Sequence, residues 1–454
     1  MNFKNMNILV CGMALSGVSA ALLLFEKGAN VTLQDIKPAE KLEKELEMIA
    51  GTNIVTYLGN DPDDIVEKFE LIIVSPGLPL DLPFVDIANR HNIPIWSEVE
   101  LAYRCCKCSI IAITGTNGKT TTTALTGEIM KAYRSGTEIV GNIGLPFTDK
   151  VKTLKAGDFA VVETSSFQLE ACRDFSPFAS AVLNISPDHL DRHKTMENYI
   201  EMKKSIFKNQ GRGSYTILNY DDPVTFAMAN EAKSKVIFFS ATSELQCGAY
   251  VDKSGYIRMR TEKMDYRILK VNELKILGSH NLENALAAVA LASVCGAPPD
   301  IIADVLKEFK GVSHRLEFVT EKSGVQFYND SKATNTDSAI KGLTAMERPV
   351  LLIAGGFDKK ADFDEWVKLF NGRVKFAAVL GQVKEQMVNT FKANNFFDYA
   401  TVDSMEDAVK LCYEKAEAGD CVLLSPACAS WDMYRSFEHR GDDFKEFTAG
   451  LSER

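Results

Sequence analysis

The stretch "AITGTNGKTTTT", residues 112–123, determines the fold that we predict for the centre of this chain. It ends an apolar, β-branched run and precedes a segment compatible with a helix. Gly115 and Gly118 allow backbone N–H groups to approach a phosphate closely. Lys119 supplies a cation for the outer phosphates, and Thr120 offers a hydroxyl to Mg²⁺. The complete pattern has glycine where this chain has Ile113, but the strand–loop–helix order still predicts a nucleotide-phosphate loop.

Length and charge limit the classes of protein to consider. At 454 residues the chain exceeds one hydrophobic core, and about 150 residues per domain suggests roughly three domains. No apolar run reaches the roughly 18–20 residues of a membrane span. The opening "MNFKNMNILVCG" enters a predicted strand at once, so we expect no signal peptide and a cytoplasmic location. The net charge of −10 argues against a nucleic-acid partner but not against a small anionic substrate.

The first α/β unit begins with "NILVCGMALSGVSAALLLFEKGANVTLQD", residues 7–35. A strand, a glycine turn, a helix and a second strand ending at Asp35 follow one another there. Gly12 and Gly17 occupy the outer positions of a dinucleotide fingerprint, but Ala14 replaces the middle glycine. A helix N-terminus at residues 15–16 could still hold phosphate. An ordinary strand–helix turn remains the alternative.

Two later stretches carry acids and histidines at the ends of predicted strands. "AVVETSSFQLE", residues 160–170, places Glu163 where a Mg²⁺ ligand belongs, although a turn or helix-capping acid is the alternative. "LNISPDHLDRH", residues 183–193, supplies Asp188, His189, Asp191 and His193. Such a cluster favours a second cation site or an anchor for substrate, and a solvated turn is the alternative.

A third α/β unit begins near residue 310. Its buried-strand candidates are "RPVLLIAGG" (348–356), "KFAAVLG" (375–381) and "DCVLLSPA" (420–427). The predicted fold is α/β with three domains. A Rossmann-like domain spans residues 1–105, a P-loop ATPase domain with a mostly parallel sheet spans 106–308, and a C-terminal Rossmann-like domain spans 309–454.

The ten cysteines are scattered, which favours reduced thiols. One cluster, "RCCKC", contains Cys105, Cys106 and Cys108. No second Cys/His group stands at a zinc-like spacing, so we interpret these thiols as structural or incidental. Whether they regulate anything is left open.

Four motifs together resemble the Mur ligases, the ATP-dependent amide-bond-forming enzymes of peptidoglycan precursor synthesis. They are "TGTNGKT" (114–120), "VSHRLEFV" (312–319), "YNDSKATN" (328–335) and "LSPACASWDMYRSFEHRGDDF" (424–444). The last motif is most similar to the members that add D-glutamate. The resemblance covers essentially the whole chain, in order.

The resemblance implies a reaction with two organic substrates. ATP would phosphorylate the carboxylate of UDP-N-acetylmuramoyl-L-alanine, and the amine of D-glutamate would attack the resulting acyl phosphate. Two Mg²⁺ ions and a carbamylated lysine are implied as cofactors. We expect a monomer whose domains close to shield the acyl phosphate from water.

The resemblance also assigns residues to roles. Catalysis falls to Lys119, His189 and Lys203, and metal binding to Thr120, Glu163, His189 and Lys203. The implied ATP contacts are Gly115, Thr116, Asn117, Gly118, Lys119, Thr120, Thr121, Asn281, Asn284, His314, Arg315, Asp330 and Lys332. The implied UDP-substrate contacts are Leu15, Ser16, Asp35, Ser75, Gly77, Asn142, Ser165 and Gln168. The implied D-glutamate contacts are His189, Thr334, Lys359, Ser430 and Phe437.

Two of these assignments choose between adjacent lysines. Counting from Tyr199 selects Lys203 over Lys204 as the carbamylated residue, and alignment on "ADF" selects Lys359 over Lys360. Four other functions were considered: a folylpolyglutamate synthetase, a sister ligase adding another amino acid, a P-loop kinase, and a nucleotide-gated binding protein. The opening domain and the 424–444 stretch disfavour the first two. Phosphate release that requires both substrate and amino acid would exclude the last two.

Overall fold

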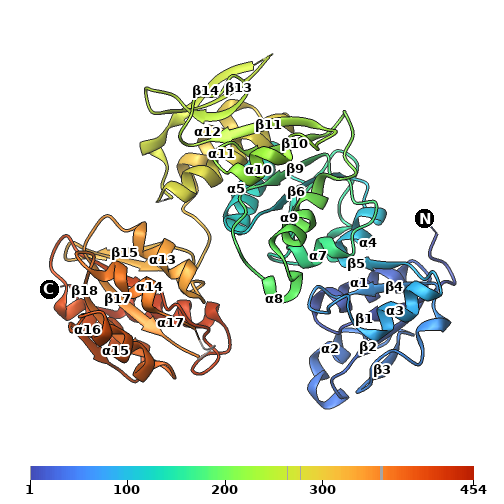
Figure 1. The fold of residues 1–454 in the computed structure, drawn as a ribbon, viewed down its shortest axis with the longest axis horizontal. Coiled ribbons are helices and arrows are strands. Elements are labelled where there is room, and N and C mark those ends of the chain that lie inside the picture. The colour runs from blue at the N-terminus through green and yellow to red at the C-terminus, as the bar shows by residue number, and fades with distance from the viewer. Residues whose placement is uncertain (1, 263, 277, 358–360, 454) are drawn as a thin grey trace. The chain divides into compact units, whose positions relative to one another are not determined.

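The computed structural model describes residues 2–262, 264–276, 278–357 and 361–453. Within them the strands form three sheets, of five, nine and six strands, with helices packed around each (Figure 1). The α/β prediction is confirmed, while the domain boundaries at residues 105 and 308 stay predictions. None of the described helices is both long enough and apolar enough to cross a membrane. The chain divides into two compact units, 1–273 with 283–307, and 274–282 with 308–454.

The first sheet is parallel throughout, in the order β3-β2-β1-β4-β5. Its strands are β1 (Asn7–Cys11), β2 (Asn30–Asp35), β3 (Val55–Leu58), β4 (Leu71–Val74) and β5 (Ile95–Ser97). The helices are α1 (Leu15–Glu26), α2 (Glu43–Met48), α3 (Pro83–Arg90) and α4 (Glu98–Cys105). Gly17 is required where α1 begins, because a Cβ there would lie 1.8 Å from the carbonyl oxygen of Gly12.

The second sheet has the order β14-β13-β12-β11-β10-β9-β6-β8-β7 and is parallel from β7 to β12. Its parallel strands are β6 (Ser109–Thr114), β7 (Glu138–Gly141), β8 (Phe159–Glu163), β9 (Ala179–Val182), β10 (Tyr215–Asn219), β11 (Lys235–Ser240) and β12 (Gly248–Val251). The strands β13 (Tyr256–Thr261) and β14 (Met264–Lys270) extend it antiparallel. This antiparallel extension was not predicted.

Eight helices with described bounds accompany the second sheet along the chain. They are α5 (Lys119–Tyr133), α6 (Phe147–Lys150), α7 (Ser166–Glu170), α8 (Leu190–His193), α9 (Met196–Lys204), α10 (Pro223–Met228), α11 (Ser279–Val294) and α12 (Pro299–Glu308). The strand β6 lies between β8 and β9: the chain leaves β6 toward β7 and β8 on one side, and the connection from β8 then crosses to β9 on the other side. In open parallel sheets this arrangement creates the crevice where ligands bind.

The third sheet has the order β15-β16-β20-β17-β18-β19, with only the β15–β16 pair antiparallel among its described strands. The strands are β15 (Glu317–Lys322), β16 (Val325–Asn329), β17 (Val350–Gly355), β18 (Val374–Leu380), β19 (Tyr399–Thr401) and β20 (Cys421–Leu424). The helices are α13 (Thr336–Thr344), α14 (Asp364–Val367), α15 (Lys384–Ala393), α16 (Met405–Lys415) and α17 (Phe437–Gly450).

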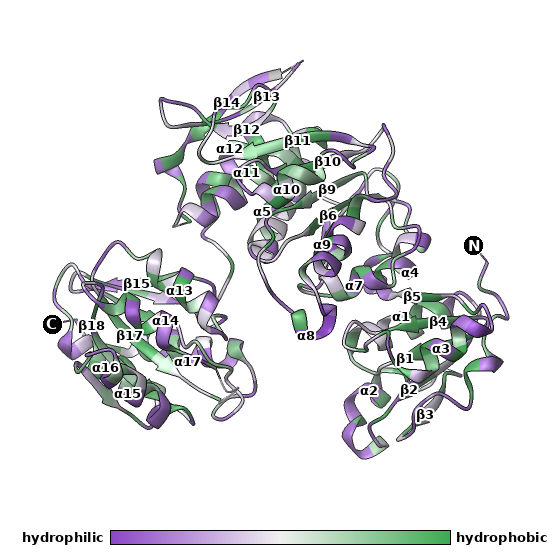
Figure 2. Ribbon diagram, viewed as in Figure 1, coloured by the Kyte–Doolittle hydropathy of each residue, from purple (hydrophilic) through white to green (hydrophobic). Residues whose placement is uncertain are grey.

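Continuous apolar strands form the core of each sheet. The strand β17 is buried along its whole length, and four of the five residues of β1 are buried. Both strands are coloured as hydrophobic in Figure 2. Parallel strands covered by helices on both faces read as unbroken apolar runs, which is why these strands were predictable.

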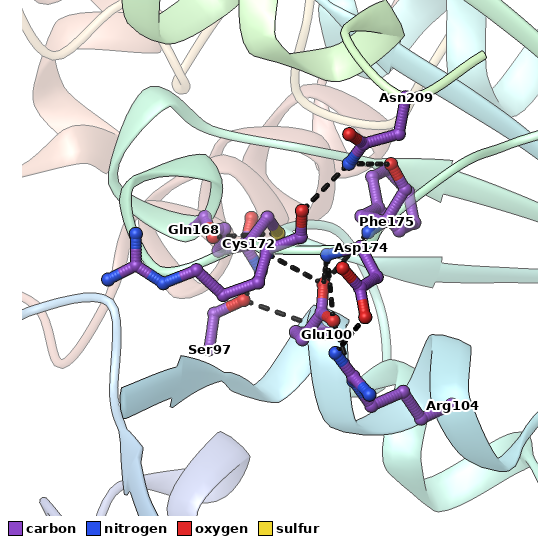
Figure 3. Close-up of polar contacts among 9 residues, drawn as sticks. Ser97, Glu100, Arg104, Gln168, Cys172, Asp174, Phe175 and Asn209 are labelled. Carbon is purple, nitrogen blue, oxygen red and sulfur yellow. Dashed lines mark hydrogen bonds and ion pairs between the residues drawn. The ribbon is translucent and has the colours of Figure 1, made fainter. Parts of the chain in front are cut away.

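A buried carboxylate joins the first sheet's last helix to the second sheet's connections. The side chain of Glu100, in α4, is fully buried and accepts hydrogen bonds from the backbone N–H groups of Arg173, Asp174 and Phe175 (2.9, 3.0 and 3.0 Å; Figure 3). The Nε of Arg104 donates to the same carboxylate at 2.7 Å. These bonds hold the segment after α7 against α4.

Candidate active site

Positive backbone φ angles and hydrogen bonds define the conformation of the phosphate loop. Gly115 and Gly118 have φ values of +154° and +81°, and a Cβ at Gly118 would meet the Asn284 side chain at 2.2 Å. The backbone N–H of Asn117 donates to Asn184 Oδ1 at 2.8 Å. The Lys119 ammonium donates to the carbonyl oxygens within its own loop, at 3.0 and 2.9 Å. The loop therefore presents glycine backbone and a lysine at the start of α5, as the sequence predicted.

A cavity of about 210 Å³ lies beside this loop in the first unit. Predicted site residues from distant parts of the chain meet in it: Gly77, Lys119, Asn142, Ser165, His189 and Lys203. Pro76, Ser166, Phe167 and Tyr199 complete the lining. The structure therefore brings one implied substrate loop, the phosphate-loop lysine, the implied metal-binding histidine and the implied carbamylated lysine to one place.

The environment of Lys203 differs sharply from that of Lys204. The helix α9 begins after Thr195, whose hydroxyl accepts the backbone N–H of Asn198. One face of α9 is buried, and Lys203 is 2% exposed with its Nζ 2.7 Å from the carbonyl oxygen of Gly115. Burial, and next the charge of Lys119, hold the pKa of Lys203 well below its usual value. Lys204 is instead paired with two surface glutamates.

Glu163 meets the chemical requirement for a cation ligand. It is 2% exposed at the end of β8, and its Oε1 accepts from the Asn142 amide at 2.8 Å. Its Oε2 is buried without a hydrogen-bond partner. A buried carboxylate oxygen that lacks a partner is costly unless a ligand or ion satisfies it. The described residues contain no group of three or more His, Cys, Asp or Glu side chains arranged for a metal.

His189 is positioned by an unusual backbone conformation. Its φ of +53° lies in the left-handed region, and it precedes the short helix α8. The imidazole packs on the Phe167 ring, with 4.8 Å between ring centroids, and remains about half exposed. An accessible imidazole at a cavity wall can contact either an ion or a substrate carboxylate.

Two side chains that support the cavity were missed from the sequence. The Arg192 guanidinium donates to the carbonyl oxygens of Pro76 and Leu78 (3.0 and 2.8 Å) and lies 4.3 Å over the Phe167 ring. The Tyr199 hydroxyl lies 3.2 Å from the Thr116 hydroxyl, and burial raises its pKa to about 12. Arg192 stands within the "DHLDRH" motif, so that motif was the available signal.

The remaining predicted UDP-substrate residues do not line this cavity. Leu15 and Ser16 begin α1, and Asp35 accepts the backbone N–H groups of Met13 and Lys37, so all three lie at the carboxyl edge of the first sheet. The Ser75 hydroxyl donates to the carbonyl oxygen of Gly12 at that same edge. Gln168 is buried in a reciprocal capping box with Ser165 at the start of α7.

The predicted nucleotide residues divide between the two units. Thr116, Thr120, Thr121 and Asn284 lie around the phosphate loop, where Asn284 Oδ1 accepts the Thr122 hydroxyl at 3.2 Å. Asn281 belongs to the second unit, as do His314, Arg315, Asp330 and Lys332. In that unit the backbone N–H of Lys332 donates to the carbonyl oxygen of His314 at 2.9 Å, and the Ser425 hydroxyl donates to Asp330 at 2.9 Å.

The described D-glutamate candidates of the second unit lie on two loops and at the start of α17, and they are joined by an arginine that the sequence reasoning missed. Arg440 Nε donates to the Ser331 hydroxyl at 3.0 Å, which in turn donates to the carbonyl oxygen of Phe437 at 2.8 Å. Arg440 also donates to the carbonyl oxygen of Ala429, beside Ser430. Thr334 follows on the first of these loops, its N–H donating to the carbonyl oxygen of Lys332. Lys359 and Lys360 lie outside the described residues.

Comparison with known proteins assigns a family to all three parts of the chain. The Mur ligase MurD-like N-terminal domain matches residues 6–97, the Mur ligase middle domain matches 113–292, and the Mur ligase glutamate ligase domain matches 314–428. A UDP-N-acetylmuramoylalanine–D-glutamate ligase from Thermoanaerobacter pseudethanolicus is 47% identical, covering 99% of this chain and 100% of its own length. The enzyme of that name from Clostridioides difficile is 45% identical, covering 98% and 99%.

Solved structures of lower identity share the fold. The UDP-N-acetylmuramate–alanine ligase of Thermotoga maritima has a TM-score of 0.61 at 18% identity, covering 98% of this chain and 100% of its own. A MurF structure from Acinetobacter baumannii also gives 0.61, at 14% identity and with coverages of 97% and 93%. With the phosphate loop and its cavity in place, these similarities show that the chain belongs to the Mur ligase family.

Proposed function

We propose that this enzyme joins D-glutamate to UDP-N-acetylmuramoyl-L-alanine at the expense of ATP, in peptidoglycan precursor synthesis. The observation that carries the proposal is the cavity in which Lys119, Asn142, His189 and Lys203 meet beside the phosphate loop. The names of relatives up to 47% identical over nearly the whole chain support the same substrates.

The reaction proceeds through an activated carboxylate. The substrate carboxylate attacks the γ-phosphorus of ATP, giving an acyl phosphate and ADP. The amine of D-glutamate then attacks the acyl carbon, and phosphate leaves with the former carboxylate oxygen. Activation is needed because phosphate is a far better leaving group than oxide or hydroxide.

The chain's own residues solve an electrostatic problem in the first step, because two anions must approach each other. Lys119 and the N–H groups of the glycine loop neutralise and orient the outer phosphates. Bound Mg²⁺ would screen the same charge, held by Thr120, Glu163 and His189, and the partnerless Glu163 Oε2 supports that placement. We propose two such ions.

Lys203 is proposed as the carbamylated residue that completes this set. Addition of CO₂ to the neutral amine gives a carbamate and one proton, and so converts a cation into an anion that can bind metal. Its burial against Gly115 and its lowered pKa both favour the neutral amine, whereas Lys204 is ion-paired at the surface. A large adjoining cavity of about 770 Å³, which shares Gly77 and Phe167 with the smaller one, offers room for the rest of the substrate.

The other assignments are proposals of the same kind. Leu15, Ser16, Asp35 and Ser75 bind the UDP end, the second unit supplies the remaining contacts to ATP, and Thr334, Lys359, Ser430 and Phe437 receive D-glutamate. Ten free cysteines are consistent with action in the reducing cytoplasm. We further propose that the enzyme acts as a monomer.

The test is phosphate release by the purified protein with ATP, Mg²⁺ and UDP-N-acetylmuramoyl-L-alanine. The amino acid is varied among D-glutamate, L-glutamate, L-alanine and meso-diaminopimelate, with omission of the amino acid as the control. Release only with D-glutamate is expected. Release with a different amino acid would overturn the assigned acceptor, and release without any amino acid would indicate an ATPase.

A further inference from the structure

The thiols of Cys106 and Cys108 face each other on the connection between the first and second sheets. Their sulfur atoms are 3.0 Å apart. Cys106 is the C-cap residue that follows α4, in an extended conformation (φ −78°, ψ 147°), and Cys108 directly precedes β6. Only Lys107 separates the two cysteines, so the pair is local to this connection.

The two sulfurs are suited to different roles in an oxidation. The hydrogen bond between the two thiols lowers the pKa of Cys106 to about 7 and raises that of Cys108. Burial instead raises the pKa of Cys11, Cys172 and most other cysteines of the chain. A thiolate is the reactive form of cysteine, and both members of the pair are only partly buried.

From this juxtaposition we propose that Cys106 and Cys108 form a reversible redox pair that closes to a disulfide under peroxide. The Cys106 thiolate gives an electron pair to one peroxide oxygen, the O–O bond breaks, and a sulfenic acid and hydroxide result. The Cys108 sulfur then attacks the Cys106 sulfur. An S–S bond forms, the S–O bond breaks, and the oxygen leaves as water with the thiol proton. A disulfide bond is about 2.05 Å long, so the sulfurs need to approach by roughly 1 Å.

The neighbouring Cys105 is not a member of the pair. It is the last residue of α4 and packs against the apolar core of the first sheet. Burial raises its pKa, so it is a weaker nucleophile than Cys106 at neutral pH. The pair therefore consists of Cys106 and Cys108, which flank Lys107 just before the strand that leads into the phosphate loop.

The sequence supplies a direct assay for this bond. Trypsin cleaves after Arg104, Lys107 and Lys119, so Cys105 and Cys106 leave in the fragment 105–107, while Cys108 leaves in the fragment 108–119. The full-length protein is reduced, freed of reductant, treated with hydrogen peroxide, alkylated while denatured, and digested without reduction. We expect the two fragments to appear as one linked species that is two hydrogens lighter than their sum, and to separate on reduction with dithiothreitol.

Three comparisons make the assignment falsifiable. The protein should lose two of its ten thiols, while the half-buried Cys247 stays available for alkylation. Cys105→Ser should keep the linked species, and Cys106→Ser should abolish it. Persistence of the link in Cys106→Ser would give the bond to Cys105. In the native protein, recovery of 105–107 and 108–119 as separate alkylated or sulfinic-acid fragments would overturn the proposal without any variant.

Discussion

Replacing Glu100 by glutamine should loosen the segment that follows α7 while preserving the shape of the side chain. The carboxylate accepts three backbone N–H groups and the Arg104 guanidinium, and no part of its side chain is exposed. An amide has one accepting oxygen: at the Oε2 position it leaves Arg104 without an acceptor, and at the Oε1 position it leaves Arg173 and Phe175 without one. In either orientation the remaining hydrogen bonds lose their charged acceptor. Hydrogen bonds to charged groups contribute about 1.5–3 kcal/mol each, so with partial relaxation the expected cost is about 2–4 kcal/mol.

Hydrogen exchange followed by mass spectrometry measures this loss locally. If the amides of residues 173–175 exchange through opening of this segment, about 2–4 kcal/mol corresponds to exchange that is roughly 30- to 700-fold faster. Peptides from β17, in the second unit, should be unchanged and serve as an internal reference. Glu128→Gln is the matched control, because the Glu128–Lys131 pair is exposed and such pairs contribute roughly 0–1 kcal/mol. Exchange of residues 173–175 at the wild-type rate in Glu100→Gln would refute the reasoning.

Three further predictions concern the site and its loops. Lys203→Ala should lower kcat by about 10²- to 10³-fold, in the range seen when charge-stabilising groups are removed. Lys204→Ala should stay within about twofold in the same phosphate-release assay. Burial raises the pKa of Asp330 to about 7, so between about pH 4 and pH 7 the folded state keeps a proton that the unfolded state has lost. The free energy of unfolding should therefore fall as the pH rises from about 4 to 7. Urea titrations should show this slope in the wild type and not in Asp330→Asn. Gly118→Ala should abolish ATP binding by calorimetry, because its Cβ would collide with a neighbouring side chain, while Gly157→Ala, also at positive φ but facing open space, should bind ATP normally.

Sequence periodicity predicted the most buried parallel strands, such as β1, β17 and β20, because each is an apolar run. It missed the antiparallel pair β15–β16, where "EFVTEKSGVQFYN" turns at Ser323 and Gly324, both at positive φ. A half-exposed hairpin of this kind has a weaker signal than a buried strand. The β13–β14 extension was missed for the same reason.

The sequence predicted the phosphate loop of the candidate site better than it predicted the side chains that surround and position that loop. The glycine–lysine–threonine pattern specifies the phosphate loop locally, because backbone conformation and one cation suffice. Lys203 and Lys204 differ because Lys203 lies on the buried face of α9 and Lys204 does not. The pattern of charges along the sequence does not distinguish two adjacent lysines. Arg192 was missed because two of its partners are backbone carbonyl oxygens more than one hundred residues away, which no local pattern reveals.

The left-handed backbone at His189 has an evolutionary consequence. Asparagine, aspartate and histidine adopt this conformation several times more readily than other side chains, and β-branched residues avoid it. Two requirements therefore limit which residues can replace His189: the polar ligand role proposed for it, and the left-handed main-chain conformation. A library that randomises codon 189 and selects only for stable folding should already be enriched in asparagine, aspartate, histidine and glycine, before any selection for catalysis is applied.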